Sequence, residues 1–110
     1  TVTLVVDRGL ASVAIIDLCQ RLGWHYVMRL SVDARQGMHV RVIDEHTGDV
    51  DHARVSIPAW ELVPGRGKRW MGTVEAFGRH GWRRAELTIV WPHRYDQPWL
   101  LLSDRTAGPD

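Results

Sequence analysis

One carboxylate, Asp7, stands where catalytic chemistry is often found in α/β proteins. It directly follows the apolar stretch Val2–Val6, which is typical of a strand covered on both faces of a sheet. Ligands and metal ions bind beyond the carboxyl ends of parallel strands in open α/β sheets. Asp7 is therefore a candidate metal ligand, although an aspartate in this position also suits an ordinary turn or helix cap.

A second set of potential ligands combines carboxylates and imidazoles between residues 44 and 52. Its members are Asp44, Glu45, His46, Asp49, Asp51 and His52. Zinc sites use ligands at fixed spacing with supporting partners, whereas this segment is more typical of a solvated hairpin turn. The remaining histidines have no serine or cysteine partner in a recognisable arrangement, so nucleophilic catalysis has no specific support.

Basic residues gather between Gly65 and Arg84, although the formal net charge of the whole chain is only +1. Against a single acid, Glu75, this stretch holds Arg66, Lys68, Arg69, Arg79, His80, Arg83 and Arg84. Trp70 and Trp82 lie among them, and the combination suits phosphate contacts together with base stacking. The stretch predicts a nucleic-acid-binding face or, equally well, two solvated hairpin strands.

The segment from Pro64 to Lys68 is rich in glycine and basic residues, but it is not a phosphate-binding P-loop. The required spacing of glycine, lysine and hydroxyl residues is absent, and no helix is predicted to follow. We therefore interpret this segment as a basic loop.

Length and composition limit the protein to one domain or a piece of one. The chain has 110 residues, of which 45% are hydrophobic, and includes six tryptophans. Cys19 is the only cysteine, so no disulfide can form within the chain. The sequence contains neither a signal peptide nor a membrane-spanning stretch, and we expect a soluble cytoplasmic protein.

The elements that would position Asp7 form a predicted βαβ unit from Val2 to Leu30. Gly23 suits the left-handed end of its helix, and Trp24–Leu30 is the predicted second, parallel strand. The apolar stripe of the helix is formed by Ala11, Ile15, Leu18 and Leu22, which follow the opening Gly9.

From Ser31 onward, short alternating segments separated by glycine, proline and charged turns predict antiparallel strands. One expected hairpin pairs His39–Ile43 with His52–Ile57, and a second pairs Gly72–Arg79 with Arg83–Trp91. Trp99–Ser103 is the expected final strand.

Three segments, taken in order, resemble bacterial insertion-sequence transposases of the Asp-Asp-Glu class, in the branch with a β-rich insertion inside an RNase H-like core. Val-Val-Asp7-Arg8-Gly9 resembles the region of the second catalytic aspartate in that family. The segment Gly23–Leu30 is similar to the strand that ends in arginine, and Pro98–Asp104 resembles the strand that closes the insertion. The resemblance covers essentially the whole chain, most clearly at both ends.

The resemblance implies an α/β fold with a partial RNase H-like core. Residues 1–32 would form its βαβ segment, residues 33–97 the antiparallel β-rich insertion, and residues 98–110 the strand returning to the core. The first aspartate of the family and its Tyr-x-x-Arg-x-x-x-Glu helix have no counterpart here. We therefore expect an internal fragment that does not cut DNA by itself.

For the intact enzyme, the resemblance implies cleavage and strand transfer of DNA at transposon ends and target, with two Mg²⁺ (or Mn²⁺) ions. Asp7 would be the catalytic, metal-binding carboxylate. The expected DNA-binding residues are Arg29, Arg66, Lys68, Arg69, Arg83, Arg84 and Trp99. A core anchor is the structural alternative for Trp99, and a strand-end residue reaching water is the alternative for Arg29.

The partners implied are DNA and, in the intact protein, a second copy in a homodimer, with no membrane. The main alternative function is a non-catalytic nucleic-acid-binding module or transposase remnant that uses the basic, tryptophan-bearing β region. A phosphoacceptor domain with Asp7 as acceptor is a third hypothesis, but the acidic pair and further βα repeats that it needs are missing.

Overall fold

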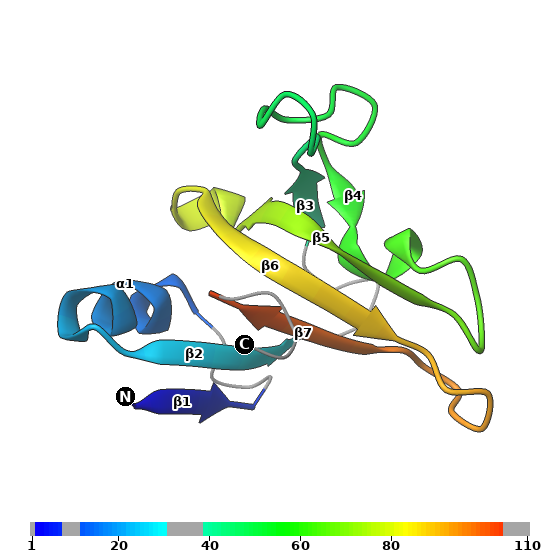
Figure 1. Cartoon of the computed structure of the whole chain (residues 1–110), viewed down its shortest axis with the longest axis horizontal. Helices are drawn as coiled ribbons and strands as arrows, with labels where there is room; N and C mark the ends of the chain where they lie inside the picture. The colour runs from blue at the N-terminus through cyan, green and yellow to red at the C-terminus, as the bar shows by residue number, and fades with distance from the viewer. Residues whose placement is uncertain (1, 8–11, 31–38, 105–110) are drawn as a thin grey trace.

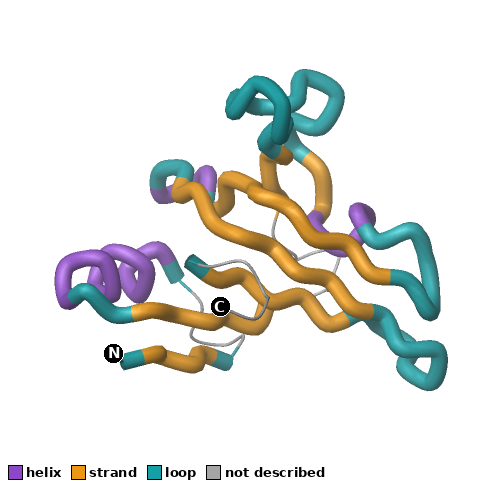
Figure 2. Tube along the Cα trace, in the orientation of Figure 1, coloured by secondary structure: helices purple, strands orange, loops and turns teal. Residues whose placement is uncertain are grey.

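A single β-sheet of seven strands dominates the part of the chain that the structure describes. The computed structural model describes residues 2–7, 12–30 and 39–104. Its elements in chain order are β1 (Thr3–Val6), α1 (Val13–Leu22), β2 (His25–Leu30), β3 (His39–Val42), β4 (Ile57–Pro58), the 3₁₀ turn η2 (Ala59–Leu62), β5 (Arg69–Ala76), the 3₁₀ turn η3 (Gly78–His80), β6 (Arg83–Val90) and β7 (Trp99–Ser103). Figure 2 shows how far strands outnumber helices.

The strand order in the sheet is β1-β2-β7-β6-β5-β3-β4. The predicted parallel pairing of the first two strands is confirmed, because β1 and β2 run side by side with Val6 opposite Met28. All other neighbours are antiparallel. The last strand of the described residues, β7, therefore lies inside the sheet, between β2 and β6 (Figure 1).

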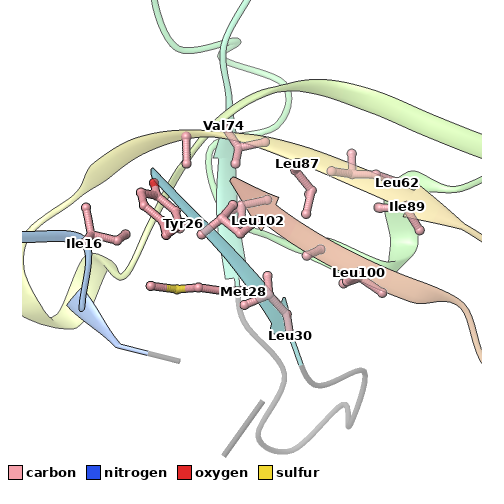
Figure 3. Packing of buried hydrophobic residues seen from close by; sticks show 14 of the residues in the cluster. Ile16, Tyr26, Met28, Leu30, Leu62, Val74, Leu87, Ile89, Leu100 and Leu102 are labelled. Carbon is pink, nitrogen blue, oxygen red and sulfur yellow. The ribbon is translucent and has the colours of Figure 1, made fainter. Parts of the chain in front are cut away.

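One face of the sheet, which we call the covered face, carries the hydrophobic core. Ile16 and Cys19 of α1 are fully buried against it, and Ala59 and Leu62 of η2 join the same cluster. The strands contribute alternate residues, as Figure 3 shows, among them Tyr26, Met28, Leu30, Val74, Leu87, Ile89, Leu100 and Leu102. The residues between these point to the other face, which we call the open face.

Helix α1 ends where the sequence predicts. Gly23 adopts the left-handed conformation with φ of 70°, which a residue without a side chain reaches at little cost. The backbone N–H of Trp24 donates to the carbonyl of Cys19 at 2.8 Å, so the chain turns directly into β2. The predicted residues Gly9 and Ala11 lie outside the described residues.

The structure corrects the predicted fold class. We expected an α/β protein with a partial RNase H-like core and a separate β-rich insertion, but the described chain is mostly β and has one short α-helix. The physical reason is that the strands after β2 do not form a separate unit. They continue the same sheet, because β7 pairs with both β2 and β6. The expected boundary between residues 32 and 33 lies outside the described residues.

The expected hairpins differ in how fully they form. The pairing of β5 with β6 is confirmed over eight residue pairs, from Arg69 opposite Val90 to Ala76 opposite Arg83. The bounds of the first strand were wrong, because β5 covers Arg69–Ala76 and not Gly72–Arg79. The hairpin after residue 39 is shorter than predicted, since β4 contains only two residues. The carboxylate of Asp51 accepts bonds from the backbone N–H of Ala53 at 3.0 Å and from Arg54 Nε at 3.0 Å. These bonds favour a turn over an extended strand.

Candidate nucleic-acid interface

One end of the open face gathers basic and aromatic side chains from three strands. Arg69 begins β5 and pairs with Val90 at the end of β6, and Val90 pairs in turn with Trp99 at the start of β7. Directly opposed residues share a face of the sheet. These three side chains therefore form a row across the open face, near the point where β2 ends (Figure 1).

Trp99 contacts both a basic and an aromatic side chain at this end of the sheet. The guanidinium carbon of Arg29 lies 4.3 Å from the centroid of its ring, and the ring of Tyr95 stacks beside it at 6.1 Å with an interplanar angle of 24°. Trp99 is 43% exposed and Tyr95 is 40% exposed. Trp99 is thus no core anchor, because the next residue, Leu100, fills the core position instead.

A hollow of about 370 Å³ opens beside these rings. Arg29 and Leu30 form its wall on β2, and Trp99 forms its wall on β7. The loop between β6 and β7 supplies the remaining lining residues, which are Tyr95, Asp96, Gln97 and Pro98. A space of this size and chemistry is sufficient for a small planar ligand.

The loops on either side of β5 and β6 bring further positive charge to the same end. The Arg66 side chain reaches Asp96 at 3.4 Å and lies 6.0 Å from the ring of Trp91. The indole N–H of Trp91 donates to the carbonyl of Tyr95 at 2.9 Å, which holds the loop that carries the Tyr95 ring. The exposed Lys68 lies in the same turn as Arg66.

We call the group formed by Arg29, Arg66, Arg69, Tyr95 and Trp99 the arginine–aromatic patch. Sequence reasoning predicted four of its members as DNA-binding residues but missed Tyr95. The available signal was a loop bounded by Pro92 and Pro98 that contains Arg94 and an aromatic residue.

Two other predicted DNA-binding residues, Arg83 and Arg84, lie at the opposite end of β6. Arg83 binds the carboxylate of Asp17 on α1 through two hydrogen bonds of 2.9 and 3.1 Å. The hydrogen bond from Arg83 lowers the pKa of Asp17, and its charge adds to this effect. Arg84 is half exposed and lies 4.0 Å from Glu75. The structure therefore does not bring these two arginines to the patch.

Asp7 lies at the carboxyl end of β1, as predicted, and is exposed. It follows Val6, which pairs with Met28, so Asp7 lies level with Arg29 on the neighbouring strand. The described residues contain no group of three or more His, Cys, Asp or Glu side chains that could hold a metal ion. The side chains described around Asp7 thus do not by themselves make up the multi-carboxylate site that two Mg²⁺ ions require.

The acidic and histidine-rich segment from residue 44 to residue 52 forms a turn. Asp44 accepts the backbone N–H of His46 at 2.8 Å, and Thr47 accepts that of Asp49 at 3.2 Å. The backbone N–H of Ala53, followed by the side chain of Arg54, lowers the pKa of Asp51. These carboxylates therefore organise the turn itself.

Comparison with known proteins assigns no class to this chain, since no family model, curated protein or solved structure matches it. None of the helices in the described residues is long and apolar enough to cross a membrane.

Proposed function

We propose that this chain is a nucleic-acid-binding module that uses the arginine–aromatic patch to hold an unpaired stretch of DNA. The observation that carries the proposal is the exposed, stacked pair of Tyr95 and Trp99 with Arg29 over the Trp99 ring. Aromatic rings of this kind stack on bases, and arginines beside them neutralise phosphates. The bases of an intact duplex are already stacked on each other, so the rings favour single-stranded or locally unpaired DNA.

The positions of the arginines along the patch support a binding path for the unpaired DNA strand. Arg69 lies two strands away from Trp99 in the same row, and Arg66 flanks the hollow through Asp96. Neighbouring strands are roughly 4.8 Å apart, so Arg69 is about 10 Å from Trp99. That distance is about one to two nucleotide steps, which allows one base on the rings and adjacent phosphates on the arginines.

The test is fluorescence anisotropy with a labelled single-stranded oligonucleotide and the same sequence as a duplex, at low salt and without divalent metal. We expect tighter binding of the single strand and weaker binding by the Trp99→Ala variant. Trp82→Ala is the matched control, because Trp82 also lies under an arginine, Arg41 at 3.9 Å, but at the far end of the sheet.

Thermal melting of each variant verifies that it is folded. Equal losses of binding in Trp82→Ala and Trp99→Ala, with both proteins folded, would refute the assignment of the patch. Equal affinity for single strand and duplex would refute the choice of unpaired DNA.

The second candidate function is that this module belongs to an insertion-sequence transposase. The position of Asp7 favours it, because the end of β1 places this carboxylate level with Arg29, at the edge of the patch. Mg²⁺ or Mn²⁺ and a homodimer remain parts of this second proposal. The free, buried thiol of Cys19 agrees with the cytoplasmic location proposed for either function.

Asp7→Ala in the protein as its gene encodes it tests the second proposal. We expect loss of DNA cleavage with DNA binding retained, and Asp104→Ala serves as a control for an acid at the other end of the described chain. Retained cleavage in a folded Asp7→Ala protein would refute the transposase proposal and leave the binding module untouched.

A further inference from the structure

The two outer strands of the described sheet differ in how readily a further strand can pair with them. At one end, β4 has only two residues, and Pro58 among them has no backbone N–H to donate. At the other end, β1 has four residues, Thr3–Val6, with neither a charge nor a proline (Figure 1). Shortness, proline and charge are the usual means by which an outer strand avoids pairing. Strand β1 has neither charge nor proline to protect it.

The hydrogen bonds of β1 show which of its backbone groups face outward. The N–H of His25 donates to the carbonyl of Val2 at 2.8 Å, so the backbone groups of Val2 point toward β2. Alternate residues of a strand direct their N–H and C=O groups to opposite sides. Thr3 and Val5 therefore direct theirs to the outer edge, beyond which no strand of the described residues lies.

The side chains of β1 also leave apolar surface at this edge. Val5 is 77% exposed, the largest value among the exposed large hydrophobic residues of the described chain. It pairs with Val27 and so lies on the open face, whereas Leu4 is half-buried on the covered face opposite Tyr26. A strand added beside β1 covers part of both side chains, so apolar burial and backbone hydrogen bonding favour the same contact.

We propose that the outer edge of β1 pairs with β1 of a second copy of this chain. The two strands run antiparallel, with Thr3 of each copy opposite Val5 of the other and Leu4 opposite Leu4. Each Thr3–Val5 pair exchanges two hydrogen bonds, which satisfies every outward-facing backbone group of both strands. The two Leu4 side chains meet on the covered face and extend the hydrophobic core from one copy into the next.

The contrast between the two outer strands selects a closed dimer. Head-to-tail association would join β1 of one copy to β4 of the next and could continue without limit, but β4 is short and ends in Pro58. A two-fold arrangement uses β1 in both copies and leaves only the β4 edges outside. The uncharged β1 gives no preference for a strongly charged partner strand, whereas a second β1 matches it in length and apolar character.

The test is the oligomeric state of the full chain, measured by sedimentation velocity without nucleic acid. Protein concentration is varied widely, up to the limit of solubility. We expect a reversible equilibrium between monomer and dimer, with no larger species. Because one short pair of strands forms the contact, the dimer should be of the weak, transient kind and should dissociate on dilution.

Substitutions of Val5 identify the edge. Val5→Pro removes the outward-facing N–H, and proline is tolerated in outer strands. The symmetry makes this a loss of two hydrogen bonds, which should raise the dissociation constant about thirtyfold. Val5→Lys keeps the N–H but places two positive charges about 7–8 Å apart across the dimer, and should weaken it several-fold. Val55→Lys is the matched control, because Val55 is an exposed valine in the loop before β4.

A single cysteine tests the alignment of the two strands. Opposed Cα atoms in a pair of the Leu4 kind are about 4.5 Å apart, which is within the range that a disulfide spans. Leu4→Cys should therefore give a covalent dimer with oxidised glutathione. Val5→Cys should give little, because its two copies lie diagonally. The unchanged chain controls for Cys19, which is buried.

Thermal melting of each variant verifies that it is folded. A chain that stays monomeric at every concentration would overturn the proposal, and so would species larger than a dimer. Equal weakening by folded Val5→Lys and Val55→Lys proteins would show that β1 is not the contact, and a disulfide in Val5→Cys but not in Leu4→Cys would refute the alignment. The proposal does not rest on DNA binding, and no oligonucleotide is present in these measurements.

Discussion

Replacing Trp99 with alanine should separate the stacking part of nucleic-acid binding from its ionic part. A base stacked on an aromatic side chain contributes about 1–3 kcal/mol, which corresponds to roughly 5- to 150-fold in affinity. Trp99 is 43% exposed and its neighbour Tyr95 stays in place, so we expect a loss near the lower part of this range, about tenfold.

The salt dependence gives the sharper part of this prediction. For single strands, the logarithm of the binding constant falls with the logarithm of salt concentration with a slope of about −0.7 per neutralised phosphate. Trp99→Ala removes no charge and should leave this slope unchanged. Arg69→Ala should reduce its magnitude by about 0.7, because Arg69 belongs to the same row of the patch.

Anisotropy titrations at four or more salt concentrations measure both quantities. Arg79→Ala is the control for charge, since Arg79 is an exposed arginine in η3, between the far ends of β5 and β6. A slope that changes as much for Arg79→Ala as for Arg69→Ala would show that binding follows total charge and not the patch. A Trp99→Ala protein that binds within twofold of the unchanged chain would refute the stacking argument.

Three further predictions concern stability. Burial, followed by the charge of Asp104, raises the pKa of Tyr26 to about 12. The folded state therefore keeps the phenol proton, and stability should fall as the pH rises from about 10 through 12; Tyr26→Phe should remove this fall in urea unfolding, and an unchanged alkaline loss would count against it. The lowered pKa of Asp17 means that its ionised carboxylate stabilises the folded state above about pH 4. This contribution to the free energy of unfolding is lost as the pH falls through the folded-state pKa. Asp17→Asn should therefore flatten the acid limb of the stability curve, and Arg83→Gln should do the same if their ion pair is the cause. Gly67→Ala should lower the free energy of unfolding by about 1–3 kcal/mol, because Gly67 has a φ of 74° and an added methyl would collide with His93; a melting temperature within one degree of the original would contradict this.

Local signals in the sequence were sufficient to predict where some elements begin or end. Gly23 predicted the end of the helix, because a left-handed residue is needed where the chain leaves α1. The predicted apolar stripe was wrong about which side of the helix is buried, because Ile16 and Cys19 are the buried residues of α1 and Leu22 is 47% exposed. The alternation from Trp99 to Ser103 gave the bounds of β7 correctly. Such features depend on neighbours within a few residues, so they can be recognised without knowledge of the fold.

The arrangement of the strands could not be predicted in this way. Nothing local to Leu102 indicates that it pairs with Met28 on one side and Leu87 on the other, since antiparallel partners can lie at any separation along the chain. The assumption that residues 33–97 form a separate insertion therefore produced the wrong fold class.

In the candidate site, too, residue types could be recognised from the sequence, whereas their arrangement in space could not. Basic residue types between Gly65 and Arg84 were recognised from composition, but only the sheet register separates Arg69, in the patch, from Arg83, which binds Asp17. Tyr95 was missed because its role depends on stacking against Trp99.

The position of β7 between β2 and β6 has a consequence for the order in which the chain can fold during synthesis. The β1-α1-β2 segment and the β5-β6 hairpin can each form from contacts close in sequence, but β7 alone joins them along the sheet. Because β7 follows both segments in the sequence, each segment keeps one pairing edge free until Trp99–Ser103 has been synthesised. Completion of the sheet is then a single late step, and this step also brings Trp99 beside Arg29 and assembles the patch.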